Sequence, residues 1–361
     1  MTLHRSALHS IAAAAGGGLQ ERFGWELPQV YTDTSSEYRA ATEAAAVHDA
    51  SYLGRLKAVG ADALDLLNRM STNLVLGLEP GQGAPTILTT DRGRILDLVG
   101  VVNTADYVLL LTSPGQQQNV IEWLDKYTIM EDLTVTDLTA ETTMLAVFGP
   151  HSQARLEELL GIGLGQLPSY HSLLGSIAGG EVRIIRRPLG ELPSFDLILS
   201  PEAAPPVWQQ LTGAGITPVG LEAYQAVRVR YAVPLYGHEM GDAYNPLEAG
   251  LIGSVDFHKG CYIGQEVIAR LDTYQKVQKH LVMLRFSSDA TASPGASLER
   301  NSQAVGAVTS VSRIPTTGEL IGLGYVRTAS AAVGTRLELA APSSGWAEIE
   351  ALPQLFGPGQ G

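Results

Sequence analysis

The chain has 361 residues, of which 45% are apolar and 17% are charged, and its formal net charge is −13 at pH 7. This length exceeds the roughly 100–200 residues that are typical of one domain, so we expect two or three domains. The negative charge argues against nucleic acid and anionic membranes as partners, because both would repel an acidic surface.

Residues 61–139 are predicted to form a unit with the element order helix, strand, strand, helix, strand. We expect the second helix to begin with Ser113 as its N-cap, Pro114 at the first helical position and Gln116 completing a capping box. The predicted elements are residues 61–70, 93–102, 106–113, 113–127 and 134–139.

A second unit with a related element order follows, which suggests a pseudo-duplicated α+β core. Its first helix is expected to end at Gly161. A basic run from Arg183 to Pro188 alternates with isoleucines, and we interpret it as a strand with one solvent-facing side rather than as a phosphate site. The predicted elements are residues 143–149, 150–161, 181–187, 195–200 and 205–215.

After about Lys276 the pattern changes to short strands at even spacing, separated by Gly, Pro and Ser turns and without helices. This pattern is typical of a small all-β domain, either a barrel or a sandwich. The predicted strands are residues 279–286, 304–314, 320–327, 335–340 and 346–353.

The sequence lacks the spacings of the common metal and nucleotide sites. One cysteine and eight scattered histidines form no C-x-x-C or H-E-x-x-H pattern, so we expect no metal site. The chain also has no dinucleotide-binding glycine motif, P-loop or nucleophile elbow. A lone cysteine and the lack of a membrane-spanning or secretory segment predict a cytoplasmic protein.

The single cysteine, Cys261, lies in the stretch HKGCYIGQEVIAR, which runs from His258 to Arg270. A buried cysteine is usually a small apolar residue. Here, however, flanking glycines, the charge of Lys259 and a predicted helix start after Gly264 all favour an exposed thiolate. His258 is a possible base for it. The motif therefore indicates a candidate reactive thiol, with core packing as the alternative.

The octapeptide KGCYIGQE resembles the signature of the folate-binding YgfZ-type proteins, which are associated with iron–sulfur cluster assembly and repair. Residues 37–73 and 226–251 are similar to further segments of the same superfamily, whose other branch is the glycine-cleavage T protein, an aminomethyltransferase. The resemblance implies an α+β fold with two folate-binding subdomains and a C-terminal barrel in a ring-like arrangement. The implied ranges are residues 1–50 with 141–275, residues 51–140, and residues 276–361.

The resemblance also implies ligand-binding residues. Asp196 occupies the position of a carboxylate that hydrogen-bonds the pterin, which suits a group able to accept two N–H donors. Asp97 matches the first of two adjacent acids in the transferases, one of which is catalytic, and Leu98 stands in place of the second. Asp97 is therefore placed near folate N5, with a half-buried strand acid as the alternative.

Other positions depart from the transferase pattern. Tyr224 replaces a ligand-binding arginine, and Arg230 replaces a glutamate. Arg228 matches an arginine of the family and is a candidate for cofactor binding or for a structural role. Tyr236 is a candidate for stacking on the ligand, with core packing as its alternative. These departures weaken the case for aminomethyl transfer. They are compatible with a pterin pocket.

Three hypotheses follow. The first is a tetrahydrofolate-binding accessory protein that serves iron–sulfur client or assembly proteins, with Cys261 beside the folate pocket, supported by Lys259, and with Asp97 as a further candidate catalytic residue. The second is a folate-dependent aminomethyltransferase. The third is a non-catalytic interaction protein with a vestigial pocket.

Overall fold

The computed structural model describes residues 3–355. The chain begins with helix α1 (His9–Ala14), the hairpin of β1 (Leu19–Arg22) and β2 (Trp25–Pro28), and helix α2 (Thr34–Glu43). Asp33 is the N-cap of α2, and its carboxylate accepts a hydrogen bond from the Ser36 backbone N–H at 2.8 Å. This side chain satisfies one of the N–H groups that the first helical turn leaves without a partner.

A six-stranded sheet forms the centre of the molecule. Its strands are β3 (Ala46–Asp49), β9 (Thr143–Phe148), β10 (Ser172–Ile177), β11 (Gly180–Arg186), β12 (Ser194–Leu199) and β13 (Thr217–Pro218). They lie in the order β10-β11-β12-β9-β3-β13, and within this order the β3–β13 pair is parallel. The accompanying helices are α5 (Ser152–Leu160), α6 (Ala204–Gly213) and α7 (Leu221–Arg230).

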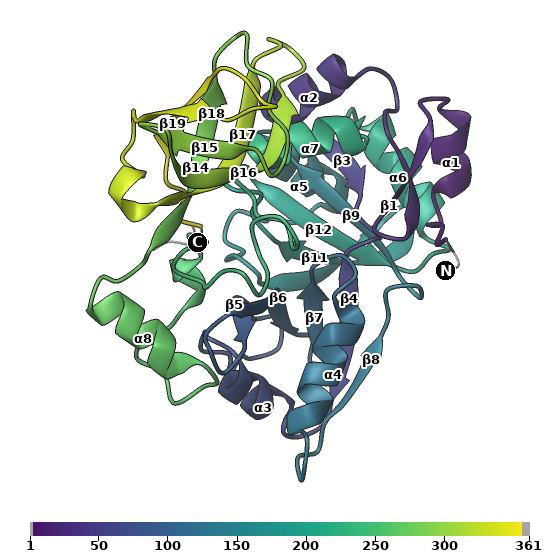
Figure 1. Cartoon of the computed structure of the whole chain (residues 1–361). Coiled ribbons are helices and arrows are strands. Elements are labelled where there is room, and N and C mark those ends of the chain that lie inside the picture. The colour runs from purple at the N-terminus through teal and green to yellow at the C-terminus, as the bar shows by residue number, and fades with distance from the viewer. Residues whose placement is uncertain (1–2, 356–361) are drawn as a thin grey trace.

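A five-stranded sheet lies below it in Figure 1. Its elements are β4 (Gly54–Val59), α3 (Ala63–Met70), β5 (Gly83–Thr89), β6 (Ile95–Asn103), β7 (Val108–Thr112), α4 (Gln117–Tyr127) and β8 (Thr134–Asp137). The strand order is β5-β6-β7-β4-β8. Apolar side chains of α3 and α4 pack on one face of this sheet, because both helices carry an apolar stripe at helical spacing.

The chain then passes through the 3-10 helix η1 (Ile252–Ser254) and α8 (Gln265–Thr273) into a closed barrel. The barrel contains β14 (Lys279–Phe286), β15 (Ser297–Arg300), β16 (Gln303–Arg313), β17 (Leu320–Arg327), the 3-10 helix η2 (Thr328–Ser330), β18 (Arg336–Leu339) and β19 (Trp346–Ala351). Closure leaves no free sheet edge, which removes the usual risk of pairing with another chain. None of the helices within residues 3–355 has the length and apolar character needed to span a bilayer.

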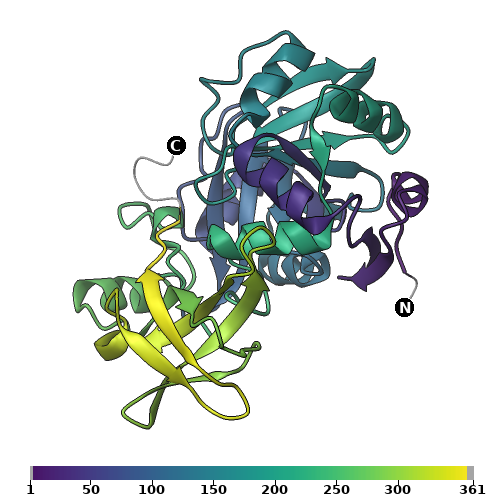
Figure 2. The same ribbon diagram turned by 90° about the horizontal axis from the view of Figure 1, so that it is seen from above.

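The three units pack against one another through apolar clusters. One face of the six-stranded sheet packs on α5 and α6, and the opposite face packs on α2 and α7. Helix α7 also contacts the barrel, where Leu323 and Tyr325 join the same cluster. Leu109 and Leu111 of the five-stranded sheet meet Ile185 of the six-stranded sheet. Figure 2 shows the barrel lying to one side of the two sheets.

These observations confirm the predicted fold class, an α+β protein with a C-terminal barrel, and the barrel has six strands where the sequence predicts five. Gly161 ends α5 in the left-handed conformation with φ of 68°, as the sequence predicts. The predicted helix start after Gly264 is also found. The barrel strand β15 was absent from the sequence prediction. The exact domain boundaries stay a prediction.

The predicted start of α4 is wrong. The helix begins at Gln117, and Gln116 is its N-cap without a side-chain hydrogen bond. Ser113 lies outside the helix, four residues before Gln117. Its backbone N–H donates to the Asp97 carboxylate at 2.9 Å, so this N–H is not available for the predicted capping box. A tertiary contact thus overrides a local capping signal.

Candidate functional site

Two adjoining chambers, together called the two-chamber cavity, lie where the two sheets, α7 and the barrel meet. The inner chamber, between the sheets, has a volume of about 110 Å³, and the outer chamber, between α2, α7 and the barrel, has a volume of about 700 Å³. Both chambers are lined by Tyr52, Tyr224, Arg228 and Leu235. The shared residues place the two chambers side by side, and the larger volume falls in the range of small-molecule sites.

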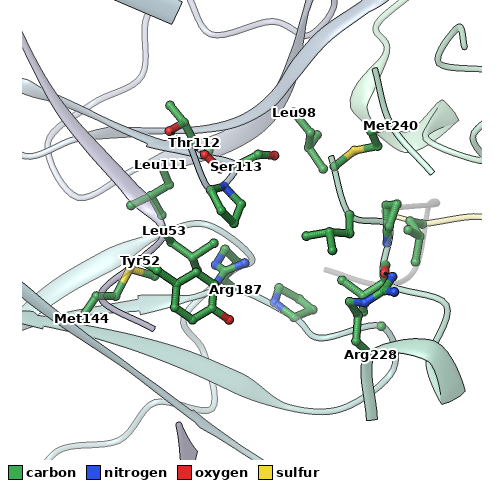
Figure 3. A pocket seen from close by; sticks show the side chains of 18 of the residues that line it. Tyr52, Leu53, Leu98, Leu111, Thr112, Ser113, Met144, Arg187, Arg228 and Met240 are labelled. Carbon is green, nitrogen blue, oxygen red and sulfur yellow. Dashed lines mark hydrogen bonds between the residues drawn. The ribbon is translucent and has the colours of Figure 1, made fainter. Parts of the chain in front are cut away.

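The inner chamber is mostly apolar and aromatic. In Figure 3, Leu98 and Met240 lie on the side of the chamber opposite Tyr52 and Arg187. Gly100 on β6 also lines it, and a Cβ atom at this position would lie 2.7 Å from the Tyr170 ring. Glycine therefore allows the ring to approach the sheet closely, which shapes a slot suited to a flat molecule.

Arg187 brings a positive charge to the inner chamber. It directly follows β11, and Asp196 lies on the neighbouring strand β12 of the same hairpin. The Arg187 side chain donates two hydrogen bonds to Asp196, from Nε to one carboxylate oxygen and from Nη2 to the other, the latter at 3.0 Å. Arg187 is 21% exposed and Asp196 is fully buried. The carboxylate therefore lies behind the guanidinium and does not line either chamber.

Asp97 also lies outside the chamber surface. Its neighbours Leu98 and Ser113 line the inner chamber, whereas Asp97 is fully buried and accepts hydrogen bonds from the backbone N–H groups of both, each at 2.9 Å. Burial raises the pKa of Asp97 to about 7, although the hydrogen bonds from Ser113 and Leu98 oppose this shift. The side chain that faces the chamber is Leu98, at the position where the transferases carry their second acid.

We predict that Asp97 makes stability depend on pH. Since the pKa of Asp97 is raised to about 7 from 3.8, the native state binds a proton in this range that the unfolded chain does not bind. Stability should therefore fall as pH rises from about 4 to 7, by roughly 1.4 kcal/mol per unit at most. Urea unfolding at pH 5 and pH 8 should show that the free energy of unfolding falls more between these pH values in the wild type than in Asp97→Asn. Parallel pH profiles of the two proteins would contradict the prediction.

Tyr224 stacks on a buried histidine at the boundary of the chambers. The rings of Tyr224 and His48 are 4.2 Å apart and nearly parallel. Burial lowers the pKa of His48, so the ring is neutral at pH 7. His48 Nδ1 lies 2.9 Å from the Val219 carbonyl and therefore carries the proton, so Nε2 accepts from the Tyr52 hydroxyl at 3.1 Å. These contacts fix both tyrosine rings.

Arg228 serves mainly to join α7 to the barrel. Its Nη1 donates to Glu239 at 2.9 Å and to the Val233 carbonyl at 2.8 Å, and its Nη2 donates to Ser310 at 2.6 Å. Glu239 is fully buried and accepts further hydrogen bonds from Ser310 and Thr309. These hydrogen bonds favour the structural role for Arg228 over cofactor binding. A ligand in the chambers would meet only the edge of the Arg228 side chain.

The loop that contains Cys261 is held by Lys259. The Lys259 ammonium donates to the backbone carbonyls of Asn68, Ser71 and Asn73 at 2.6, 2.8 and 2.8 Å. Burial lowers the pKa of Lys259 to about 8, with Asp256 opposing the shift. All three ammonium hydrogens are occupied, so Lys259 anchors the loop to the last turn of α3 and to the residues that follow it.

Cys261 itself is exposed and lines neither chamber. The structure thus places the thiol at the surface and outside the chamber linings, because Lys259 and the hydrogen bond from the Ile263 N–H to the Arg69 carbonyl hold the loop against α3. His258 is almost fully exposed and lies 3.9 Å from Asp256. No contact between His258 and Cys261 is found within residues 3–355.

Tyr236 lies apart from the inner chamber. It is partly buried in a cluster with Met240 and lines a separate groove of about 450 Å³ with Trp123 and Asp242. The surroundings of Tyr236 therefore favour core packing over stacking on a ligand in the inner chamber. Within residues 3–355 no group of three or more His, Cys, Asp or Glu side chains could hold a metal ion.

Several chamber residues were missed from the sequence. Arg187 was interpreted as part of a strand with one solvent-facing side, although it follows the strand and points into the cavity. Its position nine residues before Asp196 on a predicted hairpin was the available signal. Tyr52 and Tyr170 carried no motif that separates them from ordinary core residues.

The comparisons with known proteins agree with this architecture. The GCVT N-terminal domain matches residues 8–259, and the glycine cleavage T-protein C-terminal barrel domain matches residues 279–356. An aminomethyltransferase from Synechococcus elongatus is 30% identical over 355 residues, which are 97% of this chain and 93% of the relative. A putative chloroplastic transferase from Arabidopsis thaliana is 32% identical over 301 residues, covering 83% of this chain and 69% of the relative.

Among solved structures, the glycine cleavage system aminomethyltransferase T from Bartonella henselae superposes with a TM-score of 0.85 at 23% identity, covering 98% of each chain. This similarity supports the fold. The domain matches span most of the sequence, and their boundary between residues 259 and 279 coincides with the passage from α8 into the barrel. The chain therefore belongs to the glycine-cleavage T-protein family.

Proposed function

We propose that this chain binds tetrahydrofolate in the two-chamber cavity, with the pterin in the inner chamber and the aminobenzoyl-glutamate portion in the outer one. Aminomethyltransferases of this family use tetrahydrofolate as their one-carbon acceptor. When bound, tetrahydrofolate supplies the N5 and N10 nitrogens that carry a one-carbon unit. The observation that carries the proposal is the pair of adjoining chambers between the family's domains, of which the inner one is lined by apolar and aromatic side chains.

The residues present fit this molecule. The inner chamber is small, with a volume of about 110 Å³, and its apolar and aromatic lining suits a flat ring such as a bicyclic pterin. The outer chamber contains Arg22 and Arg313, and their positive charges complement the carboxylates of a glutamate tail.

We further propose that the chain does not catalyse aminomethyl transfer in the manner of its relatives. Leu98 faces the inner chamber where the transferases have an acid, and Asp97 holds two backbone N–H groups behind the chamber surface. Tyr224 stacks on His48 where the transferases have an arginine. A chamber without a carboxylate on its surface lacks a positioned group for proton transfer to the substrate.

The role that fits these departures is that of an accessory protein of the YgfZ type, which serves iron–sulfur client or assembly proteins. The resemblance in KGCYIGQE favours this branch. Cys261 is exposed on a loop that Lys259 holds in place, so the thiol is accessible to a partner protein and not to the folate. In this role the thiol acts by exchange with a partner or as one ligand of a shared cluster.

We predict that Cys261→Ser abolishes support of iron–sulfur enzymes and leaves folding and tetrahydrofolate affinity unchanged, because the thiol makes no contact with the cavity. The measurement is the activity of iron–sulfur enzymes in cells that lack the native protein and carry the variant. Calorimetric titration of the purified variant provides the control. Full complementation by the serine variant would show that the Cys261 thiol is not needed for the support of iron–sulfur enzymes.

The second candidate function is aminomethyl transfer, which the 30% identity to an aminomethyltransferase over 97% of the chain favours. A glycine-cleavage assay with the lipoyl carrier protein separates the two candidates. We expect no tetrahydrofolate-dependent release of ammonia above background. Turnover that depends on both the carrier protein and tetrahydrofolate would make the chain a transferase.

A further inference from the structure

The guanidinium of Arg187 has an unoccupied donor group at the inner chamber. Its Nε and Nη2 both donate to Asp196. Within residues 3–355, Nη1 has no hydrogen-bond partner, and it is not enclosed by protein. Arg187 lines the chamber, as Figure 3 shows. One edge of the planar group is thus fixed by a buried carboxylate, and the other remains available to a ligand.

The pairing changes what the site can recognise. The resemblance implies that Asp196 accepts N–H groups from the pterin, but both carboxylate oxygens already accept from Arg187, and Asp196 is fully buried. Of the described residues that line the inner chamber, none is an acid. A ligand in this chamber therefore meets a positive hydrogen-bond donor where a negative acceptor was expected.

We propose that Arg187, held in orientation by Asp196, recognises the C4 carbonyl oxygen of the bound pterin. This inference rests on the proposed tetrahydrofolate binding and specifies which edge of the ring faces the β11–β12 hairpin. The C4 oxygen is an acceptor, and the neighbouring N3–H and 2-amino groups are donors that would repel a guanidinium. The ring therefore lies with its carbonyl toward Arg187.

The carbonyl suits the inner chamber better than a carboxylate of the tail does. The chamber is narrow and lined by apolar and aromatic side chains such as Leu98, Met240 and Tyr170, which favour a flat neutral ring. Carboxylates have a wider and more polar place in the outer chamber, near Arg22 and Arg313. The geometry thus assigns the ring to Arg187 and the tail to the outer arginines.

The test compares two ligands whose C4 groups differ. Tetrahydrofolate has a carbonyl at C4, and 4-amino-4-deoxytetrahydrofolate has an amino donor at the same position. Anaerobic calorimetry should show that the wild type binds the 4-amino compound roughly 10- to 100-fold more weakly, as expected when a charge-assisted hydrogen bond is replaced by two opposed donors. In Arg187→Met this discrimination should disappear.

Two further variants keep the test decisive. Arg187→Met leaves Asp196 buried without its partner, so the double variant Arg187→Met/Asp196→Val replaces the whole pair by apolar side chains, which proteins often tolerate. It should fold and also bind both ligands equally. Arg183→Met, on the same hairpin but outside both chambers, is the matched control and should discriminate as the wild type does.

The outcomes distinguish this inference from the function on which it rests. If the wild type binds both ligands equally, Arg187 does not recognise the carbonyl. If discrimination survives in Arg187→Met, another group such as Asp196 recognises the ring, and the inference is likewise overturned while folate binding stands. If the wild type binds neither ligand, the proposed function fails and the inference fails with it.

Discussion

Replacing Glu239 by alanine should lower the free energy of unfolding by about 3–5 kcal/mol, the range for breaking a buried ion pair from one side. The Glu239 carboxylate is fully buried and accepts four hydrogen bonds, from the Arg228 side chain, the Leu235 backbone and the hydroxyls of Thr309 and Ser310. Its removal leaves the Arg228 guanidinium buried without a counter-charge. The measurement is urea unfolding followed by far-UV circular dichroism.

Two further variants test whether the loss of stability comes from the buried ion pair. Glu158→Ala removes a carboxylate that is 73% exposed and pairs only with Arg155 at the surface, so its cost should stay within about 1 kcal/mol. The double variant Arg228→Met/Glu239→Leu replaces both charges and should recover most of the lost stability. If Glu239→Ala unfolds at the same denaturant concentration as Glu158→Ala, the network does not hold the barrel against α7.

Replacing Lys259 by methionine should destabilise the protein by about 2–4 kcal/mol, because it leaves buried carbonyl groups without donors. Methionine has a similar length and apolar character, so the effect isolates the ammonium contacts with Asn68, Ser71 and Asn73. We expect the loss to concentrate in the Cys261 loop. Hydrogen exchange should therefore show faster exchange of the Ile263 amide, which donates to the Arg69 carbonyl.

The matched control is Lys276→Met, which replaces an exposed lysine just beyond α8. Substitutions at exposed sites usually change stability by less than about 0.5 kcal/mol. If both methionine variants had equal stability and equal exchange at Ile263, Lys259 would not anchor the loop. The accessory role requires Cys261 to be accessible on an ordered loop. In that case nothing in the described structure would explain how the loop is ordered.

The parts of the fold that the sequence predicted well are those set by local patterns. The left-handed end of α5 at Gly161 depends on one residue, and the barrel strands follow from alternation and turn residues. The start of α4 failed for the opposite reason. Ser113 fits a capping signal, but its N–H is taken by Asp97 from a neighbouring strand, a contact that no local pattern contains.

The candidate site depended on contacts between distant residues, and these were predicted less well. The position of Asp196 on β12 was expected, but its pairing with Arg187 depends on where β11 ends and how the hairpin turns. Lys259 was assigned to the thiol because the two residues are close in sequence. The structure instead joins Lys259 to carbonyls 186 to 191 residues away, and the loop direction that results carries Cys261 away from the cavity.

The most direct test of the account is a calorimetric titration of the purified protein with tetrahydrofolate under anaerobic conditions, alongside Leu98→Trp and Leu174→Trp. Leu98 lines the inner chamber, and a tryptophan there would fill it, whereas Leu174 is 52% exposed and lies outside both chambers. We predict saturable binding of one tetrahydrofolate per chain, retained in Leu174→Trp and weakened at least roughly tenfold in Leu98→Trp. Equal binding by all three proteins, or no binding by the wild type, would contradict a folate site in this cavity.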